Sequence, residues 1–248
     1  MLPVVEEAFD GIKSIYGEDS IARVEMMIDD NQAERLAGQE QAKWIMPGLS
    51  TTGWLEKDSY AVLSSLIGRL EDVNESVRQE VNEIYCNHSE LLDTYRHYLV
   101  DNSDWKALYL FRDGKALAPI VDGINRMPVT WLLLQKDLKD WLCPLLEMHF
   151  SILEPNTEIP PHCDLWNFTL NLHLAIEIPD QCGIKVGDEV RCWQQGECLL
   201  FDYSFLHSAW NRSGQRRVCL LMDIWHPDLT DAEKTALTAF ITELRKIT

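Results

Sequence analysis

The chain has 248 residues, and its 22 Lys and Arg against 40 Asp and Glu give a formal net charge of −18. This length supports one large domain or two small ones, with a substantial core. Because like charges repel, the acidic balance argues against binding to nucleic-acid phosphates or to an anionic membrane, although acidity also serves solubility alone. No apolar run reaches the roughly 18–20 residues that cross a bilayer, since lysines and aspartates interrupt the longest candidate at 131–146.

The cysteines and the first residues bear on the cellular compartment. The seven cysteines are odd in number and never form a C-x-x-C pair, which is typical of neither a disulfide framework nor a zinc ribbon. The opening residues MLPVVEEAFDG are acidic and lack the basic start of a signal peptide. We therefore expect reduced thiols and a cytoplasmic protein, and the oligomeric state stays open.

The first 100 residues have apolar positions spaced three or four residues apart, a pattern typical of helices. This spacing predicts helices within residues 5–16, 21–28, 63–84 and 91–99. Asp58 and Ser59 are the expected caps of the third helix, and a loop at 46–49 separates it from the second. The predictions place a helical layer ahead of the rest of the chain.

After about residue 105 the period changes to that of strands separated by turn residues. We expect strands at 105–111, 148–153, 167–178, 183–187, 190–193, 197–201 and 216–225. Pro128 suits the first turn of a helix that reaches about residue 142. A last helix opens with Thr230 and Glu233 in a capping-box pattern. Short strands of this kind favour an all-β barrel or sandwich as the core.

The strand at 167–178 has two unlike faces. One face is apolar, from Phe168 to Ile176, and the other carries the small uncharged polar residues Asn167, Thr169 and Asn171 together with His173. A solvated sheet face gives such an alternation, but it usually bears Lys and Glu. Polar groups without charge are also what a barrel interior needs to hold a polar ligand, and both interpretations remain open here.

Three residues form a candidate metal site. His162 and Asp164 make an H-x-D pair, and His207 follows 45 residues later, just beyond a predicted strand. An H-x-D pair alone is weak evidence, because chance produces it. Two His and one carboxylate nevertheless form the facial triad of non-haem Fe(II) oxygenases, which leaves coordination positions open. Arg217 lies on a following strand, where its guanidinium could pair with a carboxylate through two hydrogen bonds.

From residue 47 to residue 230 the sequence resembles the aspartyl/asparaginyl β-hydroxylase family of Fe(II)- and 2-oxoglutarate-dependent oxygenases. The resemblance is carried by PGLSTTGW (47–54), DWKALYLFRDG (104–114), FSILEPNTEIPPH (150–162), NLHLAI (171–176), GECLLFDYSFLHSAW (196–210) and RVCLLMDIWHPDLT (217–230). The last two segments are the most specific, because their spacing and the W-H-P ending both match the family.

The resemblance implies an α+β fold with a double-stranded β-helix, or jelly-roll, core. It implies an N-terminal helical extension (1–46) and an oxygenase domain (47–248), which comprises helical support (47–104), the β core (about 105–229) and a C-terminal helix (230–246). His162, Asp164 and His207 would hold Fe(II). Ser151 and Arg217 match positions that bind the distal carboxylate of 2-oxoglutarate, and His173 matches another contact to this co-substrate. O₂ would be the oxidant, with succinate and CO₂ released.

Two departures from the family concern charge. The hydroxylase that names the family has Gly at the position of Asp164, whereas bacterial relatives that act on lipid A share the H-x-D pair; the alternative is that Asp164 only caps a turn. The name-giving enzyme also has Arg at the positions of Thr169 and Asn171, where it binds an acidic substrate. A smaller, less acidic or even cationic substrate is therefore expected here. Its candidate contacts, each of which could instead be structural, are Phe111, Asp113, His149, Trp166, Thr169 and Asn171.

These observations predict a dioxygenase that hydroxylates an unactivated C–H of a small molecule, most simply an amino acid that is free, in a peptide or tethered to a carrier protein. One alternative is a lipid or acyl-chain hydroxylase. The other is a non-catalytic jelly-roll module that binds a metal or a small molecule, although such a module has no need of all six predicted iron and co-substrate residues.

Overall fold

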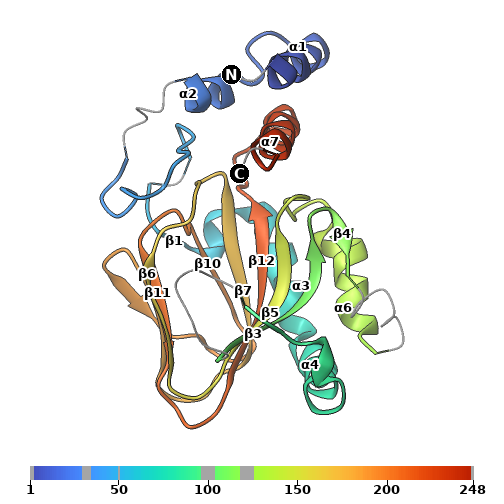
Figure 1. Ribbon diagram of the computed structural model, residues 1–248, viewed down its shortest axis with the longest axis vertical. Helices are drawn as coiled ribbons and strands as arrows, with labels where there is room; N and C mark the ends of the chain where they lie inside the picture. The colour runs from blue at the N-terminus through green and yellow to red at the C-terminus, as the bar shows by residue number, and fades with distance from the viewer. Residues whose placement is uncertain (1–2, 30–34, 50, 96–103, 118–125, 247–248) are drawn as a thin grey trace.

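The computed structural model describes residues 3–29, 35–49, 51–95, 104–117 and 126–246 (Figure 1). Two antiparallel sheets form its centre. The larger has eight strands in the order β1-β10-β7-β12-β5-β3-β2, with β4 paired to β3, and the smaller has four in the order β6-β11-β8-β9. The strands are β1 (Trp54–Leu55), β2 (Asp93–Thr94), β3 (Trp105–Arg112), β4 (Lys115–Ala116), β5 (Glu147–Leu153), β6 (Thr157–His162), β7 (Thr169–Glu177), β8 (Cys182–Val186), β9 (Glu189–Arg191), β10 (Cys198–Phe201), β11 (His207–Asn211) and β12 (Arg217–Trp225).

The connectivity of β5 to β12 is that of a jelly roll. Along the chain, β5, β7, β10 and β12 belong to the larger sheet, while β6, β8, β9 and β11 belong to the smaller one. The chain therefore crosses repeatedly between two facing sheets, which gives eight core strands in a double-sheet arrangement. The predicted α+β fold with a double-stranded β-helix core is confirmed.

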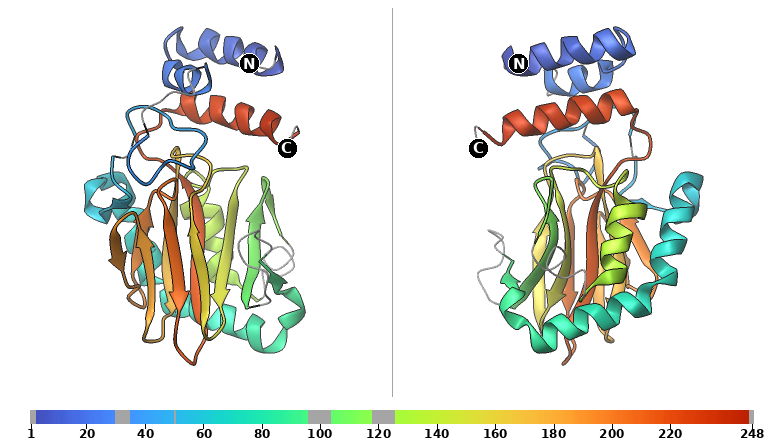
Figure 2. Two further views of the ribbon diagram at one scale, coloured as in Figure 1. Left: turned by 60° about the vertical axis from the view of Figure 1, so that its left-hand side comes forward. Right: turned by 90° about the vertical axis from the view of Figure 1, so that its right-hand side faces the viewer.

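Helices cover the outer face of the larger sheet, as the right-hand view of Figure 2 shows. They are α3 (Ala61–Asp72), α4 (Asn74–Asn87) and α6 (Pro128–Leu132), which continues as the π-helical turn η3 (Leu133–Leu138). Alternate residues of the sheet, such as Leu170 and Leu172 of β7, pack with their apolar stripes in one buried cluster. Pro128 begins α6 as predicted, because its missing N–H and fixed φ suit a first turn.

The helix predicted over 63–84 is in fact two helices. Val73 leaves helical geometry with φ −97° and ψ 3°, and the side chain of Asn74 donates to the carbonyl oxygen of Ala175 at 2.9 Å. The predicted caps were also wrong. Asp58 and Ser59 lie in the short 3₁₀ turn η1 (Lys57–Ser59), and α3 begins after Tyr60 without a side-chain cap.

The helix predicted over 91–99 is wrong where it can be compared. A 3₁₀ turn, η2 (Ser89–Leu91), is followed by β2, and residues 96–99 lie outside the described part of the chain. Pairing with β3 decides the outcome, because the Tyr95 N–H donates to the carbonyl of Trp105 at 2.8 Å and their rings stack at 4.1 Å. Tertiary contacts here override a local helical pattern.

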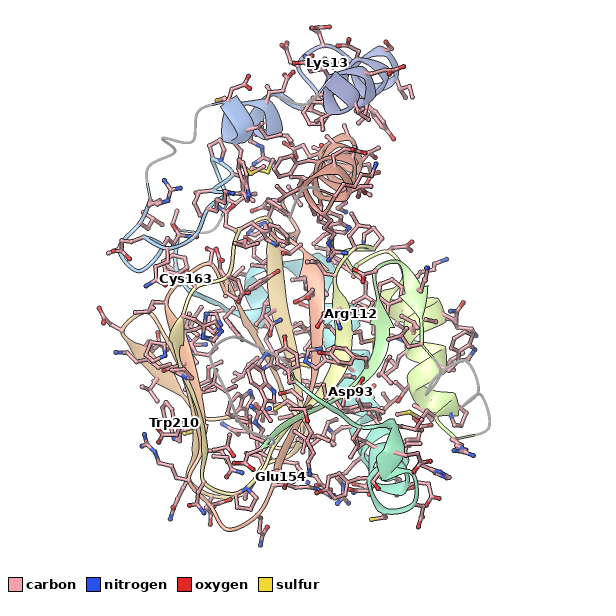
Figure 3. The ribbon with its side chains drawn as sticks, viewed as in Figure 1. Lys13, Asp93, Arg112, Glu154, Cys163 and Trp210 are labelled. Carbon is pink, nitrogen blue, oxygen red and sulfur yellow. The ribbon has the colours of Figure 1, made fainter. Side chains whose placement is uncertain are left out.

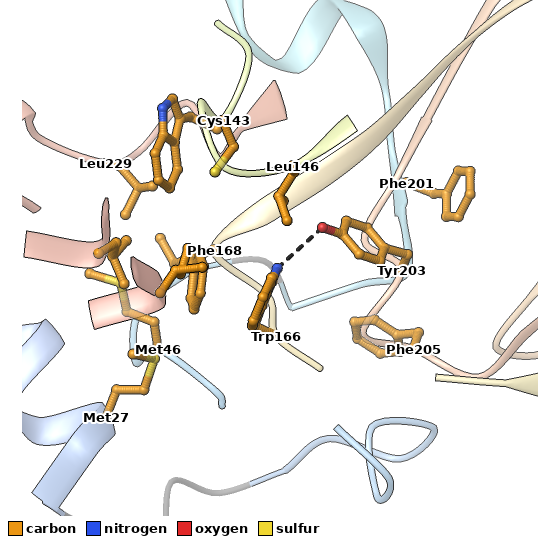
Figure 4. Packing of buried hydrophobic residues seen from close by; sticks show 14 of the residues in the cluster. Met27, Met46, Cys143, Leu146, Trp166, Phe168, Phe201, Tyr203, Phe205 and Leu229 are labelled. Atoms are coloured by element: carbon orange, nitrogen blue, oxygen red, sulfur yellow. Dashed lines mark hydrogen bonds between the residues drawn. The ribbon is translucent and has the colours of Figure 1, made fainter. Parts of the chain in front are cut away.

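Strands β6 and β11 were not predicted. β6 contains Pro160 and Pro161, and consecutive prolines favour a loop in the sequence. The strand forms nonetheless because it lies at the edge of the smaller sheet, where a missing N–H is tolerated. Phe168 also differs from its predicted face. It precedes β7 and stacks on Trp166 at 5.0 Å, within a second buried cluster, rather than joining Leu170 (Figure 4).

The N-terminal helices α1 (Pro3–Tyr16) and α2 (Ala22–Asp29) lie beside the C-terminal helix α7 (Asp231–Leu244), at one end of the sheets (Figures 1 and 2). The capping box of α7 is confirmed, since Thr230 and Glu233 bond reciprocally. Arg23 of α2 reaches Glu233 at 2.7 Å, which joins the two ends of the chain. The proposed division of the chain at residue 46 stays a prediction.

Candidate active site

A cavity of about 350 Å³ lies between the inner faces of the two sheets. Its wall includes Ser151, His162, Asp164, His173, His207 and Arg217. These are the six residues predicted to bind iron or the co-substrate, and the fold brings them to one cavity. They come from β5, β6, β7, β11 and β12 and from the loop after β6, so no single element carries the site.

His162, Asp164 and His207 form a compact group of donors. Ligand atoms of all three lie within 4.8 Å of one another. His162 ends β6 and His207 begins β11, and the two residues are register partners, which places their ring centroids 4.1 Å apart. Asp164 follows two residues after His162, and its N–H donates to the Tyr203 carbonyl at 2.9 Å, which fixes the loop.

Both histidine rings are oriented by backbone carbonyls. Nδ1 of His162 lies 2.9 Å from the carbonyl oxygen of Pro160, and Nδ1 of His207 lies 2.9 Å from that of Phe205. A carbonyl accepts only, so Nδ1 carries the hydrogen in each ring and Nε2 presents its lone pair. Nε2 of His207 lies 3.6 Å from Oδ2 of Asp164. A hydrogen bond from the second ring nitrogen to a backbone carbonyl is the usual arrangement around metal-binding histidines.

The electrostatics of the triad suit a cation. Burial lowers the pKa of His162, so its ring stays neutral, which metal ligation requires. Burial raises the pKa of Asp164, and the negative charge of Glu147 raises it further. A divalent cation between these groups would offset both effects on the carboxyl. Two imidazoles and one carboxylate, with the remaining directions facing the cavity, fit an Fe(II) site of the facial-triad type.

Arg217 and Ser151 form a second region of the cavity. The Arg217 side chain is 2% exposed, and its Nη1 donates to Oγ and to the carbonyl oxygen of Ser151 at 3.3 and 3.2 Å. Its Nε has no hydrogen-bond partner, and no carboxylate of the described residues pairs with its guanidinium. A buried, uncompensated cation is costly, so this geometry favours an anionic ligand.

Ser151 is prepared to donate to the same ligand. Trp105 Nε1 donates to its Oγ at 3.0 Å, as does Arg217, so two donors already occupy the lone pairs of this oxygen. The hydroxyl hydrogen is therefore directed to an acceptor elsewhere. Trp193 lies under the guanidinium of Arg217 at 4.7 Å and supplies an apolar face. A carboxylate of 2-oxoglutarate fits this donor set.

His173 lies on the cavity wall as predicted. Trp193 Nε1 donates to its Nδ1 at 3.2 Å, so Nε2 carries the hydrogen and donates to Oδ1 of Asn171. Burial lowers the pKa of His173 well below its ordinary value, and the charge of Arg217 adds to the effect. The imidazole is a neutral, oriented group between two polar neighbours.

Of the six candidate substrate contacts, three line the cavity: His149, Trp166 and Asn171. The other three do not. Phe111 packs toward the helical layer, because the β3–β5 register shifts between Tyr109 and Phe111. Asp113 lies in the exposed β3–β4 turn and pairs with Arg245. Thr169 is fully buried and bonds to Trp166 and Tyr203.

Several cavity residues were missed from the sequence. Tyr95, Tyr109, Glu147 and Asp223 all line the cavity. Asp223 had a usable signal, since it is the only charged residue inside the apolar run of β12 after Arg217. Tyr95 had none, because it follows a strand that was predicted as a helix. Asp223 accepts from Asn171 Nδ2 at 2.8 Å and from the Glu147 N–H at 3.2 Å.

Cys163 and His226 are not part of this group. Figure 3 locates Cys163 in the loop after β6, and its thiol donates to the carbonyl of Gly38 at 3.4 Å. His226 is fully buried at the end of β12, where its Nδ1 accepts from the Asp228 N–H at 3.2 Å. Within the described residues, no helix has both the length and the apolar composition needed to cross a membrane.

Comparison with known proteins identifies relatives. Residues 71–227 match the family model "Aspartyl/Asparaginyl beta-hydroxylase". The chain is 32% identical over 142 residues to the mouse aspartyl/asparaginyl beta-hydroxylase, covering 57% of this chain and 19% of that protein. It is 29% identical over 206 residues to the Xenopus tropicalis aspartate beta-hydroxylase domain-containing protein 2, covering 80% of this chain and 54% of that protein.

A bacterial relative and a solved structure complete the comparison. The Rhizobium tropici ornithine lipid ester-linked acyl 2-hydroxylase is 31% identical over 161 residues, covering 61% of this chain and 54% of that protein. The chain thus spans about half, or less, of the curated relatives it matches. A Pseudomonas putida prolyl-4-hydroxylase structure aligns with a TM-score of 0.40 at 15% identity, covering 65% of this chain and 98% of that one.

Proposed function

Because this chain belongs to the aspartyl/asparaginyl β-hydroxylase family, we propose that it is an Fe(II)- and 2-oxoglutarate-dependent dioxygenase. Its reaction is the hydroxylation of an unactivated C–H of a small substrate, most simply a free, peptide-borne or carrier-tethered amino acid. The observation that carries the proposal is the His162–Asp164–His207 group, within 4.8 Å, on the same cavity wall as the buried and uncompensated Arg217.

When bound, Fe(II) and 2-oxoglutarate supply the oxidising chemistry, which consumes O₂ and releases succinate and CO₂. The role of the chain is to bind and to orient. His162, Asp164 and His207 are the proposed iron ligands, held by the Pro160 and Phe205 carbonyls and by the loop bond of Asp164. Asp164 brings a negative charge that two neutral imidazoles lack.

Arg217 and Ser151 are the proposed partners of the distal carboxylate of 2-oxoglutarate. Pairing an anion with a guanidinium that is already buried avoids most of the cost of desolvating the cation during binding. Trp105 and Trp193 exclude water at this end, since both are buried and each donates an indole N–H to a cavity residue. His173 contributes an oriented, neutral polar group to the same wall.

The test begins with anaerobically purified protein to which Fe(II), 2-oxoglutarate and then O₂ are added. Succinate is measured with and without a panel of amino acids and small peptides, and mass spectrometry detects the gain of one oxygen. We expect uncoupled succinate without substrate and faster release with it. Asp164→Ala and Arg217→Glu should abolish succinate release, whereas Arg212→Ala, at an exposed surface pair with Glu158, should not change it.

Absence of succinate, together with unchanged iron and 2-oxoglutarate binding in both cavity variants, would overturn the proposal in favour of a non-catalytic module. Acyl substrates belong in the same panel, because the Rhizobium tropici relative is named as an acyl 2-hydroxylase. The polar side chains of Glu147 and Asp223 on the cavity wall fit an acyl chain poorly. A gain of oxygen on a fatty acyl probe and on no amino acid would replace the proposed substrate class.

A further inference from the structure

The cavity has a third region, formed by the β7, β12 and β5 residues on the opposite side of His173 and His149 from Ser151. Asn171 and Asp223 are register partners on β7 and β12, and the Glu147 N–H of β5 donates to Oδ2 of Asp223. Every second residue of β5 lines the cavity, namely Glu147, His149 and Ser151. The third region therefore lies at the Glu147 end of β5, four residues along the strand from Ser151.

The ion pairs of this region leave Asp223 without a partner of opposite charge among the described residues. Glu147 pairs with Arg112 at 2.9 Å, and Arg245 pairs with Asp113. Asp223 has no cation at ion-pair distance among the described residues, and its bonds come from two neutral donors, an amide and a backbone N–H. Burial and the charge of Glu147 raise the pKa of Asp223 to about 8. A carboxylate in this setting is stabilised by a cation from outside the chain.

A second observation at the same wall also points to a ligand. His149 is 5% exposed and lines the cavity, yet neither of its ring nitrogens has a hydrogen-bond partner, since Oε2 of Glu147 lies 3.6 Å from Nδ1, beyond hydrogen-bond distance. Burial lowers its pKa to about 3, and the charges of Arg112 and Arg217 act in the same direction, so the ring is neutral. A neutral imidazole always carries one nitrogen lone pair that can accept a hydrogen bond. Buried polar atoms without partners are rare in proteins, and a ligand would satisfy this one.

Two aromatic rings hold His149 in place. The His149 ring centroid lies 5.3 Å from that of Tyr95 and 5.2 Å from that of Tyr109, and all three residues line the cavity. Tyr95 also stacks on Trp105, and the Arg112 guanidinium lies over the Tyr109 ring at 4.9 Å, so these rings orient His149 through packing. An anion would have no unpaired cation to bind in this region, because Arg112 and Arg245 already pair with carboxylates of the described chain. Within the described residues, the only group with metal-binding geometry is His162, Asp164 and His207, so a second metal is not indicated.

We propose that this region binds a protonated amine of the substrate, with Asp223 as its counter-ion and His149 as a hydrogen-bond acceptor. A primary ammonium group has several N–H donors and one positive charge, which match a carboxylate and a neutral imidazole. The assignment rests on the proposed function in one respect, that the occupant of the cavity is the molecule to be oxidised. It makes Asp223 and His149 the residues that set substrate specificity.

The test compares three probes of one length and different charge, which are butylammonium, butanol and butyrate. Their binding to the full chain, loaded anaerobically with Fe(II) and 2-oxoglutarate, is measured by saturation-transfer NMR at pH 7. We expect butylammonium to bind at least about tenfold more tightly than the other two, and added salt to weaken its binding. Asp223→Asn should reduce this preference to within about twofold, whereas Asp188→Asn, at a fully exposed aspartate, should leave it unchanged.

His149→Phe separates ligand binding from folding. Phe keeps an aromatic ring beside Tyr95 and Tyr109 but removes both nitrogens, and no described group loses a hydrogen bond. We expect weaker butylammonium binding with no loss of thermal stability. Equal binding of the three probes, or full butylammonium affinity in Asp223→Asn, would overturn the site. Because binding is measured without turnover, a chain that binds butylammonium but forms no succinate would refute the proposed function and still support this site.

Discussion

His162 and His207 lie directly opposite each other on antiparallel strands, and each ring bonds through Nδ1 to the carbonyl two residues before it. The same local bond thus orients two proposed ligands that are 45 residues apart. Sheet pairing brings the rings together, and the carbonyls of Pro160 and Phe205 direct the two Nε2 atoms. The site is therefore organised before any metal binds, which lowers the cost of binding one.

The first prediction concerns Asp164. Replacement by Ala removes the only carboxylate of the triad and leaves two neutral imidazoles, so we expect Fe(II) affinity to fall by about tenfold or more. Anaerobic titration with Fe(II), followed by the absorption of the 2-oxoglutarate complex, measures this change. Cys163→Ser is the matched control, because its thiol bonds to Gly38 and not to the triad. Equal iron affinity in the wild type and Asp164→Ala would show that Asp164 is not a ligand.

The second prediction separates binding from stability at Arg217. Met fills a similar volume without charge, so we expect Arg217→Met to lose about tenfold or more in 2-oxoglutarate affinity through the missing charge-assisted bonds. Its thermal midpoint without ligand should not fall, because the variant no longer buries an uncompensated cation. Calorimetry and a melting curve measure the two quantities. A large drop in the midpoint with unchanged affinity would assign Arg217 a structural role.

The third prediction is a pH dependence at Asp223. Its pKa is about 8 in the folded protein, above the usual value near 4. At a pH between these two values the carboxyl is protonated in the folded state and ionised in the unfolded state. Stability of the wild type should therefore fall, relative to Asp223→Asn, as pH rises from about 5 to 8. The neighbouring Glu147, Asp164 and Arg112 are common to both proteins and cancel in the difference.

Chemical denaturation at several pH values gives this comparison, and butylammonium extends it. A bound cation stabilises the ionised carboxylate, so the amine should reduce the pH-dependent difference between wild type and Asp223→Asn. A difference that is constant from pH 5 to 8 would show that Asp223 is already ionised at the lower pH. A difference that amine leaves untouched would argue against Asp223 as its counter-ion.

The fourth prediction concerns Gly38, which bonds to both ligand-bearing loops. Its carbonyl accepts from the Leu206 N–H at 2.5 Å and from the Cys163 thiol at 3.4 Å. Its φ of +94° is strained for any other residue, and an added Cβ would lie 3.4 Å from the Phe205 ring. We expect Gly38→Ala to cost about 1–2 kcal/mol and to weaken iron binding through the displaced loops.

Gly11→Ala is the control for Gly38→Ala, because Gly11 lies within α1 with nothing near its added Cβ. That substitution should raise stability by about 0.5–1 kcal/mol, as expected for Ala in a helix, and should not change iron binding. Urea denaturation and Fe(II) titration measure both variants. Normal iron affinity in Gly38→Ala would show that the segment before residue 47 does not support the ligand loops.

Much of the site followed from residue types and spacing. The H-x-D pair, His207 and Arg217 indicated iron and an anionic co-substrate. Two interpretations stayed open for the polar face of the 167–178 strand, and the structure places Asn171 and His173 of that face on the cavity wall. The alternation of residues along a strand predicted the wrong face where the backbone is irregular. The register shift in β3 sends Phe111 to the helical side, while Tyr109 remains on the cavity wall.

The strands that hold the proposed iron ligands were also not predictable from local sequence. β6 contains consecutive prolines and β11 has no clear alternation, so neither is evident until they pair with each other. Tyr95 joined the cavity only because β2 pairs with β3, against the local helical pattern. Whether such short strands form depends on pairing with distant segments, and this contribution cannot be inferred from the local sequence.

The acidity of the chain, its β-rich core and its candidate ligands were determined by the sequence alone, because these depend on composition, periodicity and residue type, whereas the jelly-roll class followed from the family resemblance. Only the tertiary structure decided which charges are compensated. Arg112 and Glu147 neutralise each other across β3 and β5, whereas Asp223 and Arg217 face the cavity with no opposite charge from the described chain. Charge pairing depends on distance and burial, which sheet register sets between residues far apart in the sequence.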